Sequence, residues 1–202
     1  MALRVGVAVA LCGALGLGLA GCGGGGEAAL ALVTGQVVDD GSLQGIANAT
    51  VRIGAARDDT AADGTFIIND APTGTQTLSI TAAGHEAYQQ GVSLAGGTNT
   101  LGLLYLPPTL AAGTGAITGT LVLSNGSRVE DGVVRSGAVS ARSRSDGTGR
   151  FTLYSVPPGT PQVTFIDPVS GESAWRYITV TAGGLADVGQ VRLSSGPPPP
   201  PL

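Results

Sequence analysis

The side chain with the most specific chemistry is the thiol of Cys22, which stands where an apolar N-terminal segment meets a run of glycines. Before it, Arg4 and the amino terminus supply a positive end, and the stretch Val5 to Leu19 is apolar and uncharged. A positive end, a short apolar core and small residues before a cleavage point are typical of a secretion signal. We therefore expect cleavage between Gly21 and Cys22, which leaves the thiol as a point for lipid attachment.

The four residues Leu19-Ala20-Gly21-Cys22 resemble the lipobox of bacterial lipoproteins. The resemblance implies a lipid on Cys22 and an extracytoplasmic position at the cell membrane or the outer membrane. A retained membrane helix is a weaker alternative, because an apolar run of about sixteen residues spans about 24 Å and the hydrocarbon core is roughly 30 Å thick. Ordinary secretion after cleavage is the other alternative.

The remaining sequence offers few groups for catalysis. It contains no lysine, which excludes Schiff-base and Walker-type chemistry, and both cysteines, Cys12 and Cys22, fall in the signal region. The one histidine, His85, comes without a Gly-x-Ser-x-Gly motif, and we interpret it as a partly packed corner side chain. We predict no catalytic residue, no metal site and no cofactor.

Charge is unevenly distributed between the two halves of the chain. Residues 32–106 hold two arginines and seven acidic residues, whereas residues 116–193 hold seven arginines and six acidic residues. This balance excludes a typical nucleic-acid-binding protein. Arg142 and Arg144, two apart on a predicted strand, indicate a solvated sheet face or ion pairs with acids of the first half. An anionic glycan or a phospholipid headgroup is the alternative partner.

The two halves of the chain repeat one another at an offset of about 84 residues. The matched segments, in order, are Val33-Thr34-Gly35-Gln36-Val37 with Ile117-Thr118-Gly119-Thr120-Leu121, Asp63-Gly64 with Asp146-Gly147, Pro72-Thr73-Gly74 with Pro157-Pro158-Gly159, and Ala95-Gly96-Gly97 with Ala182-Gly183-Gly184. Four landmarks in the same order predict two copies of one structural unit.

Within each copy apolar and polar residues alternate with the period of a half-buried strand. Ala49, Val51 and Ile53 fall on one face, and Leu78 and Ile80 do the same in a later segment. Aspartate–glycine and asparagine–glycine pairs between these segments are typical of tight turns. Several short strands in a unit of about 75 residues predict an all-β chain of two tandem small sandwiches.

The order of these features resembles the carboxypeptidase regulatory-like domain. The first copy carries the resemblance through Gly35, Val37, Asp39, Ala49, Val51, Ile53, Asp63, Gly64, Phe66, Pro72, Gly74, Gly84 and Tyr88. The second copy departs from it at Ser124, in a longer Asp-Gly turn, and between Asp167 and Ser173. The resemblance implies a transthyretin-like, seven-stranded sandwich of a carbohydrate-binding-like fold group. It also implies an accessory role, without the catalytic domain of those enzymes.

The expected organisation follows from these boundaries. We predict a signal peptide at 1–21, a lipidated Cys22 and glycine-rich tether at 22–31, sandwiches at 32–106 and 116–193, a linker at 107–115, and a proline-rich tail at 194–202.

Aromatic residues of the second copy suggest one binding site. If Ile178 and Val180 point inward, alternation directs Trp175 and Tyr177 outward, and Tyr154 is outward on its own strand. Exposed planar rings favour stacking on sugars, whereas packing against the neighbouring domain is the structural alternative.

Together these features predict a non-enzymatic, lipid-anchored protein of the cell envelope that acts as a structural, adhesion or interaction module. Two alternatives remain: a surface-displayed carbohydrate-binding module, and an accessory subunit of an exported enzyme or outer-membrane transporter. The expected partners are the membrane, through Cys22, and an envelope glycan or envelope protein.

Overall fold

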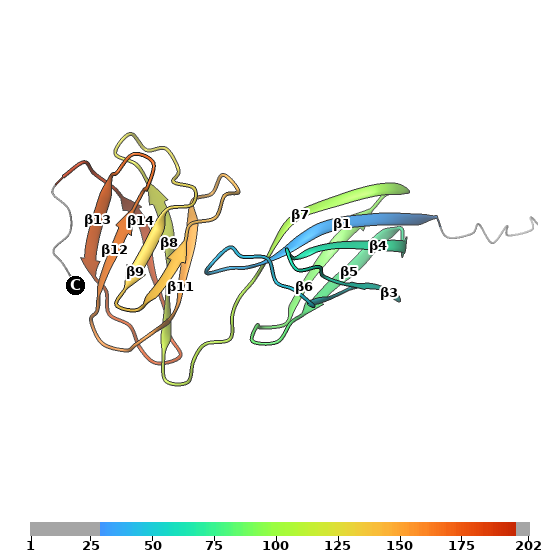
Figure 1. The fold of residues 1–202 in the computed structure, drawn as a ribbon, viewed down its shortest axis with the longest axis horizontal. Coiled ribbons are helices and arrows are strands. Elements are labelled where there is room, and N and C mark those ends of the chain that lie inside the picture. The colour runs from blue at the N-terminus through green and yellow to red at the C-terminus, as the bar shows by residue number, and fades with distance from the viewer. Residues whose placement is uncertain (1–28, 197–202) are drawn as a thin grey trace, which may run out of the picture.

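The computed structural model describes residues 29–196 as two β-sandwiches that follow one another along the chain (Figure 1). The strands of the first are β1 (Leu30–Asp39), β2 (Thr50–Ile53), β3 (Ala56–Asp59), β4 (Thr65–Pro72), β5 (Gly74–Thr81), β6 (Tyr88–Leu94) and β7 (Gly97–Leu106). Those of the second are β8 (Gly115–Val122), β9 (Val133–Ser136), β10 (Val139–Arg142), β11 (Arg150–Val156), β12 (Gln162–Ile166), β13 (Ser173–Tyr177) and β14 (Leu185–Arg192). The predicted all-β fold class is confirmed.

The first sandwich pairs a three-stranded sheet, β4-β1-β7, with a four-stranded sheet, β3-β2-β5-β6. Strand β1 runs antiparallel to β4 and parallel to β7. The alternation seen in the sequence explains the core, because Ala49, Val51, Ile53, Leu78 and Ile80 are all fully buried.

The second sandwich repeats this topology strand for strand. Its sheets have the orders β11-β8-β14 and β10-β9-β12-β13, and β8 again has an antiparallel and a parallel neighbour. Phe151 and Phe165 pack within its core at 5.6 Å between ring centroids. The buried apolar residues form two separate clusters, one in each sandwich. Each unit therefore has its own hydrophobic core.

The matched Asp-Gly turns have the same hydrogen bonds in both copies. Oδ1 of Asp63 accepts from the amide of Thr65 at 3.0 Å and from its hydroxyl at 2.7 Å, and Asp146 accepts from both groups of Thr148 in the same way. Hydrogen bonds from Thr65 hold the pKa of Asp63 below its ordinary value. Burial is the largest single cause at Asp146 and raises its pKa, but the bonds from Thr148 and the charge of Arg144 together lower the pKa of that carboxyl. The repeated Asp-Gly sequence thus forms the same hydrogen-bonded turn in both sandwiches.

The segment between the sandwiches is bonded to both of them. The carbonyl of Pro107 accepts from the amide of Glu86, and the amide of Thr109 donates to Gly84, each at 2.9 Å. At the other end the carbonyl of Thr114 accepts from Gly183 at 2.8 Å. Both ends of the segment are therefore fixed to the adjacent sandwich.

One strand is shorter than the sequence predicted. Strand β10 ends at Arg142, and Arg144 does not share its face. The reason is that the amide of Arg144 already donates to the carbonyl of Arg150, so the chain has turned toward β11.

Several sequence-based predictions lie outside the described residues. They are the signal at 1–21, the lipidated Cys22 with most of its tether, and the last six residues of the tail. Within residues 29–196 we find no helix long and apolar enough to cross a membrane.

Candidate functional site

The carboxylate of Asp40 joins the two sandwiches. It follows β1 directly, is only 3% exposed, and accepts from the second sandwich with both oxygens. Oδ1 accepts from Nε of Arg144 at 2.7 Å and pairs with its terminal nitrogen at 2.5 Å, while Oδ2 accepts from the Tyr154 hydroxyl at 2.7 Å. The expected pairing of an arginine in this region with an acid of the first half is confirmed for Arg144.

Further contacts surround this carboxylate. The amide of Arg142 donates to the carbonyl of Gly41 at 2.8 Å, which attaches β10 to the loop after β1. The guanidinium of Arg144 lies over the ring of Tyr105 in the first sandwich, 4.2 Å from its centroid. Arg144 therefore contacts the first sandwich through both an ion pair and a cation–π interaction.

At the joint, the contact that Asp40, Arg144, Tyr154 and Tyr105 form between the sandwiches, burial raises the pKa of both tyrosines. Loss of hydration, followed by the bond and charge of Asp40, raises the pKa of Tyr154 far above its ordinary value. Burial is also the largest cause of the raised pKa of Tyr105, whose buried hydroxyl has no hydrogen-bond partner among the described residues.

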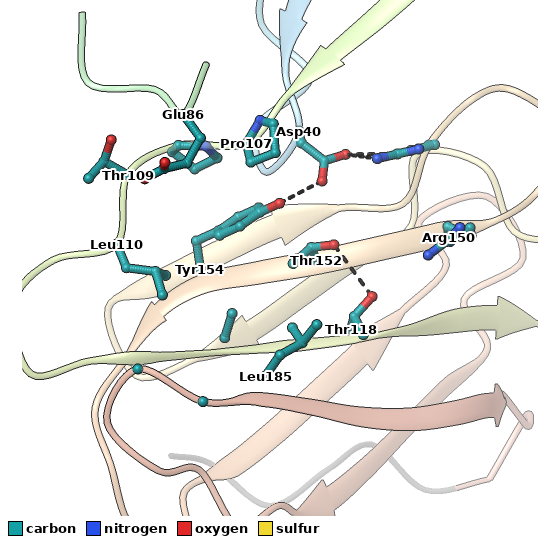
Figure 2. A pocket seen from close by; sticks show the side chains of 15 residues that line it. Asp40, Glu86, Pro107, Thr109, Leu110, Thr118, Arg150, Thr152, Tyr154 and Leu185 are labelled. Atoms are coloured by element: carbon teal, nitrogen blue, oxygen red, sulfur yellow. Dashed lines mark hydrogen bonds and ion pairs between the residues drawn. The ribbon is translucent and has the colours of Figure 1, made fainter. Parts of the chain in front are cut away.

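A cleft of about 520 Å³ lies beside the joint, as Figure 2 shows. The linker and the first sandwich form one wall, and the outer face of the β11-β8-β14 sheet forms the other. Its labelled lining residues are Asp40, Glu86, Pro107, Thr109, Leu110, Thr118, Arg150, Thr152, Tyr154 and Leu185. Within this lining Tyr154 is bonded to Asp40, and the hydroxyls of Thr118 and Thr152 lie 3.4 Å apart.

His85 is a structural side chain at the corner between β5 and β6. Its Nε2 lies 3.1 Å from Oδ2 of Asp39 and its Nδ1 lies 3.0 Å from the carbonyl oxygen of Ala83. Oδ1 of the same aspartate accepts from the Ser42 hydroxyl at 2.8 Å. A catalytic triad needs the imidazole between hydroxyl and carboxylate, whereas here the carboxylate lies between the other two. His85 therefore does not contact the Ser42 hydroxyl and cannot act as its general base.

The aromatic residues predicted to bind sugar do not form one group. Trp175 and Tyr177 are 43% and 67% exposed on β13, with ring centroids 5.8 Å apart in an edge-to-face arrangement. Tyr154 lies on β11, in the opposite sheet, where the loop after β1 covers it and Asp40 accepts its hydrogen bond. The predicted grouping of Tyr154 with the other two was therefore wrong, because the neighbouring sandwich packs on its strand.

Sequence reasoning missed the roles of Asp40 and Tyr105. Asp39-Asp40-Gly41 has the composition of a solvated turn, and no local pattern distinguishes its second aspartate. The available signal was the contrast between an acidic first half and an arginine-rich second half. That contrast predicted ion pairing between the halves, though not the residue of the first half that makes it.

Comparison with protein families agrees with the topology of the first sandwich. Residues 32–103 match the family model of the carboxypeptidase regulatory-like domain. This stretch runs from β1 into β7 and so covers nearly all of the first sandwich. The second sandwich lies outside this match and has the same strand order as the first.

Several solved structures are similar to parts of this chain at low sequence identity. A cohesin–X-dockerin complex of Acetivibrio cellulolyticus is 23% identical over 38% of this chain and 56% of that chain, with a TM-score of 0.34. The TIE protein of Bacillus anthracis is 12% identical over 82% and 34%, with a TM-score of 0.33. GBS52, the minor pilin of Streptococcus agalactiae, is 11% identical over 85% and 99%, with a TM-score of 0.26.

The chain spans 56% and 34% of the first two of these structures, and their activities are not transferred to it. A search of the curated proteins found no match. The matched family is that of a regulatory-like domain, and both units of this chain have a β-sandwich fold.

Proposed function

We propose that this chain is a non-enzymatic interaction module of the cell envelope, anchored by a lipid on Cys22, in which a fixed joint sets the orientation of the second sandwich. The observation that carries the proposal is the buried carboxylate of Asp40, which accepts hydrogen bonds from Arg144 and Tyr154 across the joint.

The joint is suited to holding one orientation. Because each sandwich has its own core, the relative position of the two depends on contacts between them and on the linker. The bonds to Asp40 and the bond from Arg142 to Gly41 arise from three places on the second sandwich. A hinge motion has to break them together, and charge-assisted bonds with defined geometry resist such a motion.

The position of the anchor supports the same function. Only a few residues separate Cys22 from Leu30, where β1 begins. A lipid on Cys22 would therefore hold the first sandwich close to a membrane and present the second beyond it. Lipidation contributes about 0.8 kcal/mol of binding free energy for each buried methylene, so stable attachment needs more than one acyl chain.

The joint is tested by measuring the distance between the sandwiches in solution. With both native cysteines replaced by serine, Gln89→Cys and Gln190→Cys place one spin label on an exposed position of each sandwich. We expect a narrow distance distribution by pulsed electron resonance, and a broad one when Asp40→Ala is added. The Asp59→Ala chain, which loses an exposed acid of the first sandwich, is the control. A broad distribution in the parent chain would contradict the fixed joint.

The anchor is tested separately in cells. We expect the parent chain to fractionate with membranes and to incorporate labelled fatty acid, and the Cys22→Ser chain to do neither. A Cys22→Ser chain that still carries label and still sediments with membranes would refute the anchor, and it would leave the result on the joint unchanged.

A further inference from the structure

The outer face of the sheet β10-β9-β12-β13 combines exposed aromatic rings with unpaired arginines. Pairing register places Thr164 of β12 opposite Trp175 on one side and opposite Arg135 on the other, and Arg135 lies opposite Ser140 of the edge strand. These four residues form one row across the sheet, with neighbours about 4.8 Å apart in strand spacing. We call this surface the aromatic–arginine face.

One end of the face presents rings to solvent. Trp175 and Tyr177 project from the same side of the edge strand β13, and their edge-to-face arrangement exposes a ring face and a ring edge together. Their cross-strand neighbours are Thr164 and Gln162, both polar. The two residues of β12 opposite the rings are therefore polar, although Thr164 is itself buried.

The other end of the face is a small groove that carries positive charge. Its volume is about 270 Å³, and its lining includes Arg135, Arg142 and Ser140 together with Ser42 and Gln44 from the first sandwich. No acidic side chain lines it. Among the described residues neither arginine has a carboxylate within ion-pair distance, and the only recorded bond of the Arg142 guanidinium is to the carbonyl of Asp131 at 3.4 Å. Both charges are available to a ligand.

The corresponding sheet of the first sandwich lacks these properties. The four strands β9, β10, β12 and β13 contain three arginines and no acidic residue. Their counterparts β2, β3, β5 and β6 contain two arginines, balanced by Asp58 and Asp59, and a single aromatic residue, Tyr88. Because the two sheets share one topology, the fold does not require the aromatic–arginine face. Its composition belongs to the second copy alone.

We propose that the aromatic–arginine face binds a linear acidic polysaccharide, with a sugar ring on Trp175 and Tyr177 and a uronic-acid carboxylate at Arg135 and Arg142. The apolar C–H face of a pyranose packs on an aromatic ring, and a guanidinium binds a carboxylate through two parallel hydrogen bonds. The inference rests on the proposed function, because it gives the interaction module its partner.

The composition of the face favours a polysaccharide over a membrane surface. Between the rings and the groove the row contains Thr164, which is buried, and Ser140 lines the groove beside Arg135 and Arg142. Exposed rings at one end of the face and two arginines at the other match a polymer that repeats sugar rings and carboxylates along its length. Insertion into a bilayer instead needs apolar side chains that project together over a broad surface.

The test uses Trp175 as its own reporter, since it is the only tryptophan of the chain. The full chain with Cys22→Ser is titrated with oligogalacturonate and with the fully methyl-esterified oligomer, which keeps the sugar and removes the charge. We expect a saturable change in tryptophan fluorescence with the acid form, weakening as salt rises, and little change with the ester. Equal binding of both forms would overturn the proposal.

Variants then locate the site. The double variant Arg135→Gln, Arg142→Gln should weaken binding at least about tenfold, equivalent to 1.4 kcal/mol. The control removes the same charge from the matching sheet of the first sandwich through Arg52→Gln and Arg57→Gln, and should bind as the parent does. The affinity of the Trp175→Ala chain for oligogalacturonate, measured by calorimetry, should also fall about tenfold. Circular dichroism and the thermal midpoint verify folding of each variant.

Two further results would overturn the proposal. One is equal affinity of the two double variants, which would show that charge on this face is not recognised. The other is binding to phosphatidylglycerol vesicles that depends on Arg135 and Arg142 while oligogalacturonate does not bind, which would identify a membrane surface instead. Neither result bears on the anchor, because the titrated chain lacks Cys22. The hypothesis of a fixed joint is likewise tested only by the distance measured between the two spin labels.

Discussion

The Tyr154 hydroxyl donates a 2.7 Å hydrogen bond to the carboxylate of Asp40, although 114 residues separate the two in the chain. Tyr154 faces away from the core of its own sandwich, and the buried carboxylate that accepts from it belongs to the other one. The bond therefore lies in the contact between the sandwiches and outside both hydrophobic cores.

Replacing Tyr154 by phenylalanine removes this donor and keeps the ring. A buried carboxylate that loses one of its partners costs about 1–3 kcal/mol. We expect the Tyr154→Phe chain to lose about that amount of unfolding free energy, measured by urea denaturation. The matched change is Tyr88→Phe, since the Tyr88 hydroxyl donates to Gln90 at an exposed position. That change should cost no more than about 0.5 kcal/mol. Equal losses in the two variants would contradict the role of the bond.

Stability at alkaline pH should depend on the same tyrosine. Burial and Asp40 raise the pKa of Tyr154 above its ordinary value of 10.0, whereas the unfolded chain ionises near that value. The contribution of Tyr154 is thus fully present below about pH 10, and it is lost as pH rises above the unfolded pKa toward the folded one.

We expect the unfolding free energy of the parent chain to fall more steeply with pH above 10 than that of Tyr154→Phe. Denaturant titrations at a series of alkaline pH values measure both slopes. Part of the slope should persist in the variant, because burial also raises the pKa of Tyr105. Parallel slopes for the two chains would show that Tyr154 ionises alike in the folded and unfolded states.

Local sequence patterns predicted much of the fold but not the joint. Alternation at Ala49, Val51 and Ile53 placed these residues correctly in the core, because strand period alone determines which face is buried. It also gave the outward direction of Trp175 and Tyr177, whose edge strand has no further neighbour in its sheet.

The same alternation directed Tyr154 outward, and the structure agrees. What covers it was not predictable, because a contact between residues 114 positions apart leaves no trace in the period of either strand. The burial of Asp40 could not be predicted for a similar reason. Its neighbours predict a solvated turn, and only the approach of Arg144 from the second sandwich makes burial of its charge tolerable.

The ring of Tyr105 should matter more than its hydroxyl. The ring supports the guanidinium of Arg144 at 4.2 Å, while the buried hydroxyl has no partner among the described residues. Tyr105→Phe keeps the cation–π contact and removes a polar group that burial penalises, so we expect unfolding free energy to stay equal or rise by up to about 1 kcal/mol. Tyr105→Leu should lower it by about 1 kcal/mol or more. A lower stability for Tyr105→Phe than for Tyr105→Leu would show that the hydroxyl is bonded in solution.

Alanine substitutions at two glycines of the first sandwich distinguish the cost of backbone strain from the cost of steric overlap. Gly64 and Gly74 have nearly the same positive φ, 84° and 85°. A Cβ on Gly64 would lie 2.2 Å from the carbonyl oxygen of Val37, whereas a Cβ on Gly74 would meet nothing within 4 Å.

An alanine at either position has to adopt a left-handed conformation, which costs about 1–2 kcal/mol. Gly74→Ala should lose that amount of unfolding free energy and no more. At Gly64 the added methyl group must also displace β1 from the turn, where the amide of Val37 donates to the Gly64 carbonyl at 2.8 Å. We therefore expect Gly64→Ala to cost at least about 2 kcal/mol more than Gly74→Ala, the range of a lost buried hydrogen bond with overpacking. Urea denaturation of the two variants measures the difference, and equal costs would mean that the turn after Asp63 yields without strain.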